Sequence, residues 1–261
     1  MRALSIGATG MMAQQLNVEV ISNNIANLST TGFKRSRAEF QDMLYENLRR
    51  VGSASTDTGT LLPSGLQLGL GVKPVATYRI NQQGNLSVTN NTYDLAINGR
   101  GFFQVQQADS TTAYTRAGSF QLNQNGQIVT ADGLQIIPSI TVPQNAISVT
   151  VNASGQVLAS IDGQTQLQTL GQLQLATFTN PTGLESIGDN LLKETESSGT
   201  PVVGNPQAAG FGTLVQGSLE TSNVDIVNEI TNLISAQRAY EMNSKVIKTA
   251  DEMLTTVSQL R

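Results

Sequence analysis

The stretch SNVDIVNEITNLISAQRAYEMNSKVIKTADEMLTTVSQLR, residues 222–261, decides the fold, and it contains neither Gly nor Pro. Ser222 followed by Asp225 predicts a helix start, because both side chains can accept hydrogen bonds from free amides. At about 1.5 Å per residue, the helix would be roughly 60 Å long. Its apolar residues recur at the three- and four-residue spacing of one helical face: Ile226, Val227, Ile230, Leu233, Ile234, Val246, Ile247, Ala250, Met253, Leu254, Val257 and Leu260.

The other end of the chain predicts a second amphipathic helix, over residues 1–28. Thr30, Thr31 and Gly32 end it, since glycine is common just past a helix C-terminus. Long helices at the two ends imply that the termini meet and that the intervening chain is an insertion. The apolar residues of this helix also follow helical spacing: Leu4, Ala8, Met11, Val18 and Ile25.

This N-terminal helix carries little charge. Between residues 1 and 33 only Arg2 and Glu19 are charged, and the second face consists of Gln, Asn, Ser and Thr. A solvent-facing helix of a monomer normally carries more charge, so the pattern favours packing of the helices against further copies of the chain. The alternative is an ordinary helical hairpin with an amide-rich surface.

The composition excludes several classes of function. The net charge is −4 and only 13% of the 261 residues are charged, which argues against a nucleic-acid-binding surface. There is no Cys and no His, which excludes thiol nucleophiles, Cys/His zinc sites and histidine-dependent triads. The N-terminus lacks a cleavable signal pattern, and no apolar run is long enough for a transmembrane helix.

Residues 33–71 are predicted to be a connector and an extended arm. The charged segment 33–45 is interpreted as a solvated connector, docked by its aromatic and leucine side chains, rather than as a nucleic-acid patch. Residues 49–71 are rich in Gly, Ser and Thr. Within them Leu62, Leu66, Leu68 and Leu70 alternate, which indicates an extended segment able to lie on another surface.

From residue 72 to 221 the pattern is typical of β-structure. Three copies of a weak repeat, beginning at Ile80, Leu122 and Val151, are each expected to form a hairpin turn around Asn and Gly. Asp132-Gly133 and Asp162-Gly163 are expected to turn the chain again. The predicted fold class is therefore α+β: a terminal helical domain (1–32 and 222–261), the connector and arm (33–71), and a β-rich outer domain (72–221).

No catalytic, cofactor-binding or metal-binding constellation is evident. The carboxylates of the β region are scattered, no calcium-loop spacing occurs, and the absence of Trp argues against sugar binding. Arg100 and Arg116 lie near aromatic residues at expected strand ends, and we expect them to pair with an acid or a carbonyl group.

Several longer strings carry a resemblance to a known family. Asn23-Asn24-Ile25-Ala26-Asn27-Leu28-Ser29-Thr30-Thr31-Gly32-Phe33-Lys34 resembles the N-terminal signature of the bacterial flagellar rod and hook family, and Gln237–Lys245 resembles its C-terminal signature. The strings at 62–67, 114–120, 182–188 and 220–225 are similar to those of distal-rod members. The likeness covers nearly the whole chain.

The resemblance implies a structural subunit, not an enzyme, of the flagellar basal body. Paired, coiled-coil-like helices would form a tube around the export channel, and copies would assemble into a straight hollow shaft that transmits torque to the hook. Implied partners are the chain itself, proximal rod and hook subunits, the peptidoglycan and outer-membrane bushing rings, and the export apparatus. The protein would span the periplasm after export without a cleaved signal.

The resemblance leaves alternatives: a hook or proximal rod subunit, a cell-wall hydrolase, or a secreted coiled-coil adhesin. No cofactor, metal or nucleic acid is expected. We expect the rod-specific arm to include Leu62, Pro63, Ser64, Gly65 and Leu66. We expect the assembly surface on the helices at Leu4, Met11, Val18, Asn23, Asn24, Ile25, Asn27, Ile230, Leu233, Ile234, Tyr240, Ile247 and Leu254.

Overall fold

The computed structural model describes residues 2–49, 65–164 and 166–259, and the chain divides into two compact units. The first, here called the helical unit, consists of Met1–Ile25, Ser36–Tyr78 and Asp225–Arg261. The second, here called the β unit, consists of Ala26–Arg35 and Arg79–Val224. Each unit is therefore assembled from segments that lie far apart in the sequence.

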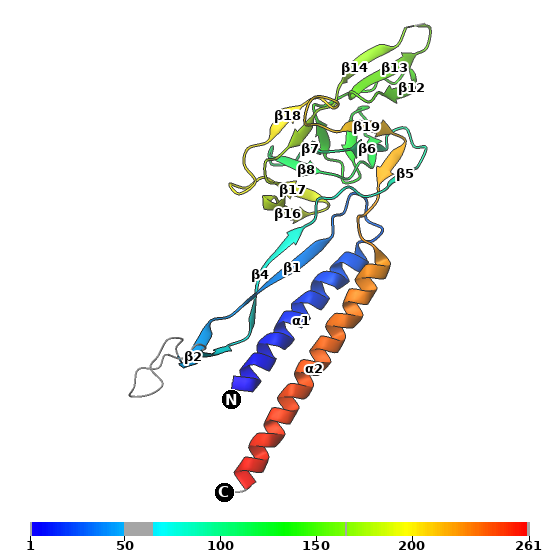
Figure 1. The fold of residues 1–261 in the computed structure, drawn as a ribbon. Coiled ribbons are helices and arrows are strands. Elements are labelled where there is room, and N and C mark those ends of the chain that lie inside the picture. Colours follow the sequence, from blue (N-terminus) through cyan, green and yellow to red (C-terminus); the bar gives the residue numbers. More distant parts are fainter. Residues whose placement is uncertain (1, 50–64, 165, 260–261) are drawn as a thin grey trace. The chain divides into compact units, whose positions relative to one another are not determined.

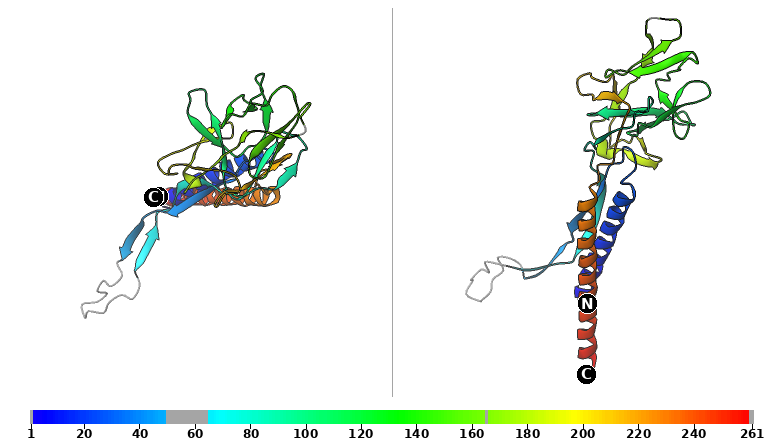
Figure 2. Two further views of the ribbon diagram at one scale, coloured as in Figure 1. Left: turned by 90° about the horizontal axis from the view of Figure 1, so that it is seen from above. Right: turned by 90° about the vertical axis from the view of Figure 1, so that its right-hand side faces the viewer.

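Two long helices dominate the helical unit. Helix α1 (Arg2–Ala26) and helix α2 (Ile226–Gln259) lie side by side and run antiparallel, so that both chain termini lie at the same end of the pair (Figures 1 and 2). The prediction of two terminal helices that meet is confirmed, and the mixture of helices and strands agrees with the α+β class. Neither described helix combines the length and apolarity needed to cross a membrane.

Helix α2 begins later than the sequence pattern predicted. Asp225 Oδ1 accepts hydrogen bonds from the backbone amides of Val227 (3.0 Å) and Asn228 (3.4 Å), so Asp225 caps the helix. Ser222 Oγ instead accepts from the amide of Val224, within the β unit. Both residues are suitable caps, and the one used is Asp225, which directly precedes the first helical residue, Ile226.

A ribbon of strands completes the helical unit. Strand β1 (Ser36–Asp42) pairs with β4 (Val72–Arg79), and β2 (Tyr45–Arg49) pairs antiparallel with β3 (Leu66–Gly69). The segment 33–45, predicted to be a connector, is thus largely strand. The extended conformation predicted for the leucine-alternating arm is confirmed at β3, whereas Leu62, Pro63 and Ser64 lie outside the described residues.

The β unit is built from antiparallel sheets, one of nine strands and the others of two or three. The largest has the order β16-β17-β8-β7-β11-β10-β9, and β15 joins it by pairing with both β7 and β18. Strands β12-β13-β14 form a three-stranded sheet, and the pairs β19-β6 and β20-β5 are two-stranded. The strands are β5 (Leu86–Val88), β6 (Leu95–Asn98), β7 (Phe102–Gln106), β8 (Thr112–Thr115), β9 (Phe120–Leu122), β10 (Ile128–Thr130), β11 (Gln135–Ile137), β12 (Ala146–Val151), β13 (Gln156–Ile161), β14 (Gln168–Gln172), β15 (Leu175–Thr177), β16 (Glu185–Gly188), β17 (Leu191–Lys193), β18 (Val202–Gly204), β19 (Thr213–Gln216) and β20 (Ser218–Glu220).

The core of the β unit is aliphatic with a few aromatic rings. Phe103 and Phe120 pack edge to face, with ring centroids 5.1 Å apart, among the buried side chains of strands β6 to β19. A second cluster contains Phe102, Tyr114 and Phe178 in similar edge-to-face contacts. Aromatic pairs in this geometry add about 0.5 to 1.5 kcal/mol beyond the burial of their surface.

Two of the three predicted repeat turns exist. Gly126 (φ 74°) and Gly155 (φ 83°) lie in turns in which the side chains of Asn123 and Asn152 accept backbone hydrogen bonds. The first copy, Ile80–Leu86, is not a hairpin, because it joins β4 and β5, which pair with different partners. The Asn-x-x-Gly pattern alone does not select the strand that a flanking segment will pair with.

Candidate assembly surface

Small and polar residues form much of the contact between the two helices. On α2 the seam repeats every seven residues at Glu229, Ala236, Asn243 and Ala250, of which Asn243 is half-buried and the others are buried. A Cβ atom added to Gly7 of α1 would lie 2.9 Å from the Ile247 side chain. Gly10 likewise approaches Asn243 so closely that a Cβ atom would lie 2.8 Å from its Nδ2.

Asn24 joins three elements of the helical unit. Its Nδ2 donates to the carbonyl oxygen of Ser36 (2.9 Å) and to Glu229 Oε2 (3.3 Å), and its Oδ1 accepts from the Ser36 amide (2.8 Å). Asn24 is 1% exposed. A buried polar group that finds all its partners in only one arrangement specifies the alignment of α1, β1 and α2.

Many large apolar side chains of α2 and two of α1 are exposed, although Ile21 of α1 is buried. Met12 on α1 is 68% exposed and Ile234 on α2 is 45% exposed. A monomer rarely exposes an apolar stripe of this length unless another protein covers it. The exposed large apolar residues of α2 are Ile226, Val227, Ile230, Ile234, Tyr240, Met242, Val246, Met253 and Leu254.

The residues predicted for the assembly surface divide by exposure. Among them Asn24 is buried, and Asn27 lies in the turn that follows α1. Leu4, Met11, Val18, Ile25, Asn27, Leu233 and Ile247 are half-buried, and Asn23, Ile230, Ile234, Tyr240 and Leu254 are exposed. Their role in assembly stays a prediction.

A groove runs between the helices on one side. It has a volume of about 480 Å³ and is lined from α1 by Gln15, Val18 and Glu19, and from α2 by Gln237, Tyr240 and Glu241. Its polar rim and half-buried Val18 make it suited to contact with another amphipathic helix.

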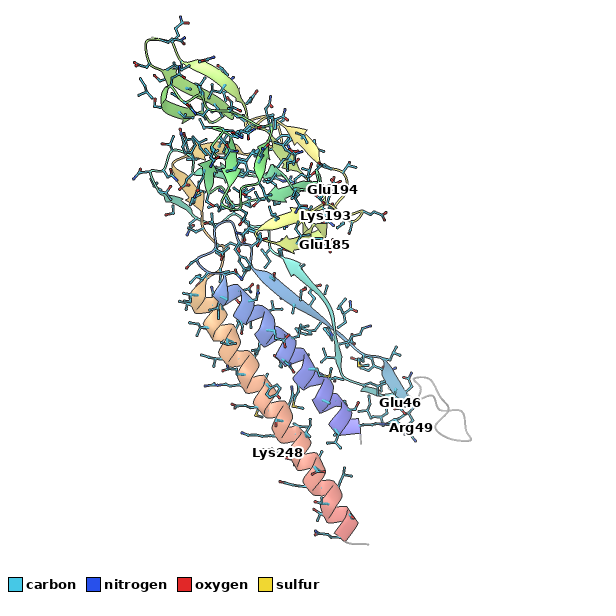
Figure 3. The ribbon with its side chains drawn as sticks, turned by 180° about the vertical axis from the view of Figure 1, so that it is seen from behind. Glu46, Arg49, Glu185, Lys193, Glu194 and Lys248 are labelled. Carbon is cyan, nitrogen blue, oxygen red and sulfur yellow. The ribbon has the colours of Figure 1, made fainter. Side chains whose placement is uncertain are left out.

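The arm exposes a second apolar surface. In β2 and β3, Leu48 and Leu66 are exposed, as are Leu44 and Leu68, while Gly65 is half-buried. Glu46 lies on β2 (Figure 3), and its ion pair with Arg2, at 2.7 Å, joins the start of α1 to this strand. Exposed pairs of this kind contribute little to stability, so the arm is only weakly fastened at this point.

The β unit contains a buried cluster of charges that the sequence pattern did not reveal. Glu220, 1% exposed, receives hydrogen bonds from Lys34 Nζ (2.5 Å) and Arg116 Nε (2.6 Å), and its Oε1 also accepts from the Gly84 amide. Arg116 further donates to the carbonyl oxygens of Ile97, Gly99 and Gly101. The prediction that Arg116 pairs with an acid and carbonyl groups is confirmed.

Burial and charge act against each other in this cluster. Burial lowers the pKa of Lys34 more than the hydrogen bond and charge of Glu220 raise it. Burial alone would raise the pKa of Glu220, but Arg116 and Lys34 together hold it below the ordinary value. The carboxylate of Glu220 thus pairs with two cations. Its bond with Lys34 joins the segment just after α1 to strand β20.

No group of acids in the described residues is arranged to hold a metal ion. Charged side chains such as Glu185 and Lys193 lie on the neighbouring strands β16 and β17, where they face one another in register (Figure 3). Among the described residues, the exposed apolar faces of the helices and of the arm are surfaces suited to contact with protein.

Three family models match the chain. Residues 4–34 match the flagella basal body rod protein family, residues 96–159 match the D1 domain of the flagellar hook protein FlgE/F/G family, and residues 215–260 match the C-terminal region of the flagellar basal body rod FlgEFG proteins.

Relatives match over the full length. The chain is 57% identical over 261 residues to the flagellar basal-body rod protein FlgG of Caulobacter vibrioides, with 100% of both chains covered. It is 55% identical to FlgG of Buchnera aphidicola subsp. Schizaphis graminum, with 99% of both chains covered. It is 39% identical to FlgG of Bacillus subtilis, with 100% of this chain and 99% of the relative covered. The chain therefore belongs to the flagellar basal-body rod protein family, as a structural subunit of the distal rod and not an enzyme.

Proposed function

We propose that the helical unit forms the inner wall of a straight hollow polymer and that the β unit is its outer domain. The observation that carries this proposal is the distribution of side chains on the helices. Gly7, Gly10 and Ala236 are used in the contact between α1 and α2, while Ile230 and Ile234 remain exposed. In this arrangement further copies of the chain cover the exposed apolar faces.

The helix pair is coiled-coil-like in this proposal. A seven-residue repeat of seam positions is the spacing that lets two helices remain in contact along their length. The assembly surface comprises the predicted helical positions from Leu4 to Leu254, and the arm around Gly65 and Leu66 reaches a neighbouring copy. The helical domain would then correspond to the terminal segments and the outer domain to the strand-rich middle of the chain.

We extend the proposal to the finer cellular assignments, which membership of the family supports. The polymer would join proximal rod subunits and hook subunits and turn inside the bushing rings of the peptidoglycan and outer membrane. It would reach the periplasm through the flagellar export apparatus. No step of this assembly calls for a cofactor.

The test is polymerisation of the purified chain. We expect sedimentable tubes above a critical concentration, visible by negative-stain electron microscopy, and monomers below it. A discrete small oligomer that does not grow with concentration would contradict the proposal and favour a coiled-coil adhesin. Release of sugar or peptide from purified cell walls would favour a hydrolase.

A further inference from the structure

A pocket of about 260 Å³ opens in the β unit beside the buried charge cluster. Its lining includes Asn81, Arg100 and Arg116, together with Phe102 and Phe178, and it contains no acidic side chain. Polar donors and an apolar wall therefore meet in one concave site, as they do in pockets that bind part of a ligand.

The positive charge around this pocket exceeds the negative charge. Arg116 and Lys34 share the single carboxylate of Glu220, so two cations are buried against one anion. Arg100 adds a third cation at the pocket, where it is exposed. Since buried charge is strongly destabilising without a counter-charge, a further anion at this place would be favourable.

An unpaired donor independently indicates a ligand. The Nδ2 atom of Asn81 is buried and donates to no acceptor in the described structure. Buried donors nearly always have an acceptor, and this one belongs to a residue that lines the pocket. Asn81 is half-buried, and a turn of its side chain toward the pocket would present this donor to an oxygen atom of a ligand.

We propose that this pocket binds the carboxylate side chain of an aspartate or glutamate on a peptide segment. A carboxylate is planar and matches the guanidinium group of Arg100 in the two-bond geometry that such pairs adopt. The rings of Phe102 and Phe178, whose centroids lie 6.0 Å apart, form an apolar wall for the methylene groups and neighbouring side chain of the peptide. Binding at this site can be measured on the monomer, and the site goes beyond the proposed function.

The direct test is an NMR titration of the full-length monomer, kept below its polymerisation threshold, with N-acetyl-Phe-Glu-amide. The side-chain amide signals of Asn81 should shift, and N-acetyl-Phe-Gln-amide, which lacks the charge, should bind about tenfold more weakly or less well still. Inorganic phosphate should also bind more weakly, because it makes no contact with the rings. Equal binding of the Glu and Gln peptides would overturn the proposal, and so would equal binding of phosphate.

Substitutions distinguish specific binding in the pocket from nonspecific attraction of the anionic peptide to positively charged side chains. Arg100→Gln should reduce binding of the Glu peptide by about tenfold. Lys193→Gln, which removes an exposed cation of the same unit that does not line the pocket, should leave the affinity unchanged. Equal loss in both variants, or no loss in Arg100→Gln, would overturn the proposal.

Polymerisation measurements show whether the carboxylate comes from a second copy of this chain or from another protein. If it belongs to a second copy of this chain, Arg100→Gln should raise the critical concentration, and the Glu peptide should inhibit wild-type polymerisation. If it belongs to another protein, polymerisation should be unchanged while peptide binding is lost. Both results support the site, and peptide binding by the monomer separates failure of this proposal from failure of the proposed function.

Discussion

Lys34 Nζ lies 2.5 Å from Glu220 Oε1, although 186 positions separate the two residues in the sequence. The Gly32 amide donates to the Glu220 carbonyl oxygen, and the Arg35 amide donates to Asn223 Oδ1. The segment that follows α1 and the segment that precedes α2 are therefore fastened to each other within the β unit. This contact makes residues 32–35 part of the β unit.

Replacing Glu220 with Gln should destabilise the β unit strongly. The substitution keeps the shape of the side chain but leaves Lys34 and Arg116 buried without their common counter-charge. Breaking a buried ion pair on one side lowers the free energy of unfolding by about 3 to 5 kcal/mol. Chemical denaturation followed by near-ultraviolet circular dichroism would measure the loss. Glu196→Gln, at an exposed position, is the matched control and should change stability little.

The contribution of Glu220 should also depend on pH. The pKa of Glu220 in the folded state lies below its ordinary value of 4.5. The contribution of Glu220 to the free energy of unfolding is therefore fully present above pH 4.5, and it is lost as the pH falls through the lowered pKa. The stability difference between wild type and Glu220→Gln should thus be constant at neutral pH and narrow in acid. Urea titrations from about pH 7 to about pH 3 would check this, and a difference that stays constant to the lowest pH would contradict it.

Hydrogen exchange should separate the two units in the isolated monomer. The amide of Gly32 donates to the Glu220 carbonyl oxygen at 2.8 Å and should be protected. Amides in α1, such as that of Met12, should exchange quickly, because the apolar faces of the helices lack neighbours and ordering costs about 1 to 2 kcal/mol per residue. Strong protection throughout both helices in a proven monomer would show that the helix pair folds without assembly.

Replacing Ile234 with Asp should abolish polymerisation without unfolding the β unit. Burial of an isoleucine side chain contributes about 1.5 to 3 kcal/mol, and an unpaired carboxylate adds a desolvation penalty. Each 1.4 kcal/mol lost at a contact should raise the critical concentration by about tenfold. Sedimentation and electron microscopy would measure assembly, and circular dichroism would verify the β unit.

The control for this variant is Ser235→Asp, which adds the same charge at an adjacent exposed position that is not apolar. It should polymerise more readily than Ile234→Asp. Normal polymers and normal motility of cells carrying Ile234→Asp would mean that residue 234 faces solvent in the assembled form.

Deleting residues 49–63 should leave polymerisation possible but yield curved rods. We expect this because the arm has an alternating leucine pattern and because Leu66 and Leu68 of β3 are exposed, which suits contact with a neighbouring copy. The measurement is the curvature of isolated rods by electron microscopy. Rods as straight as those of the wild type would assign the arm another role.

Local periodicity was sufficient to predict the two helices, but not the way they touch. The apolar pattern includes Ile247, which does approach Gly7, but it also directs attention to the exposed Ile230 and Ile234. It cannot distinguish Gly7, Gly10 and Ala236 from neutral surface. Strand β1 was missed for a related reason. Arg37 and Glu39 alternate with Ala38 and Phe40 in a strand, yet the density of charge resembles that of a solvated connector.

Long-range pairing lies beyond local patterns. The repeat at Ile80 resembles the two repeats that do form turns, but its flanking strands find partners elsewhere in the chain. The cluster of Lys34, Arg116 and Glu220 has no local signal either, because charged residues so far apart could each equally well be exposed. Only the two predicted terminal helices indicated that the segment after α1 and the segment before α2 would lie close together.

The single alignment selected by Asn24 has a mechanical consequence. A slip of α1 along α2 by one seven-residue repeat would move it about 10 Å. In one direction such a slip would bring Asn24 opposite Ala236, which offers no side-chain acceptor, and would separate it from Glu229. An axial load in that direction would therefore have to break the bond between Asn24 and Glu229 before the helices could slide. The side chain of Asn24 thus opposes sliding of α1 along α2 and so helps to keep the length of the helix pair constant under an axial load.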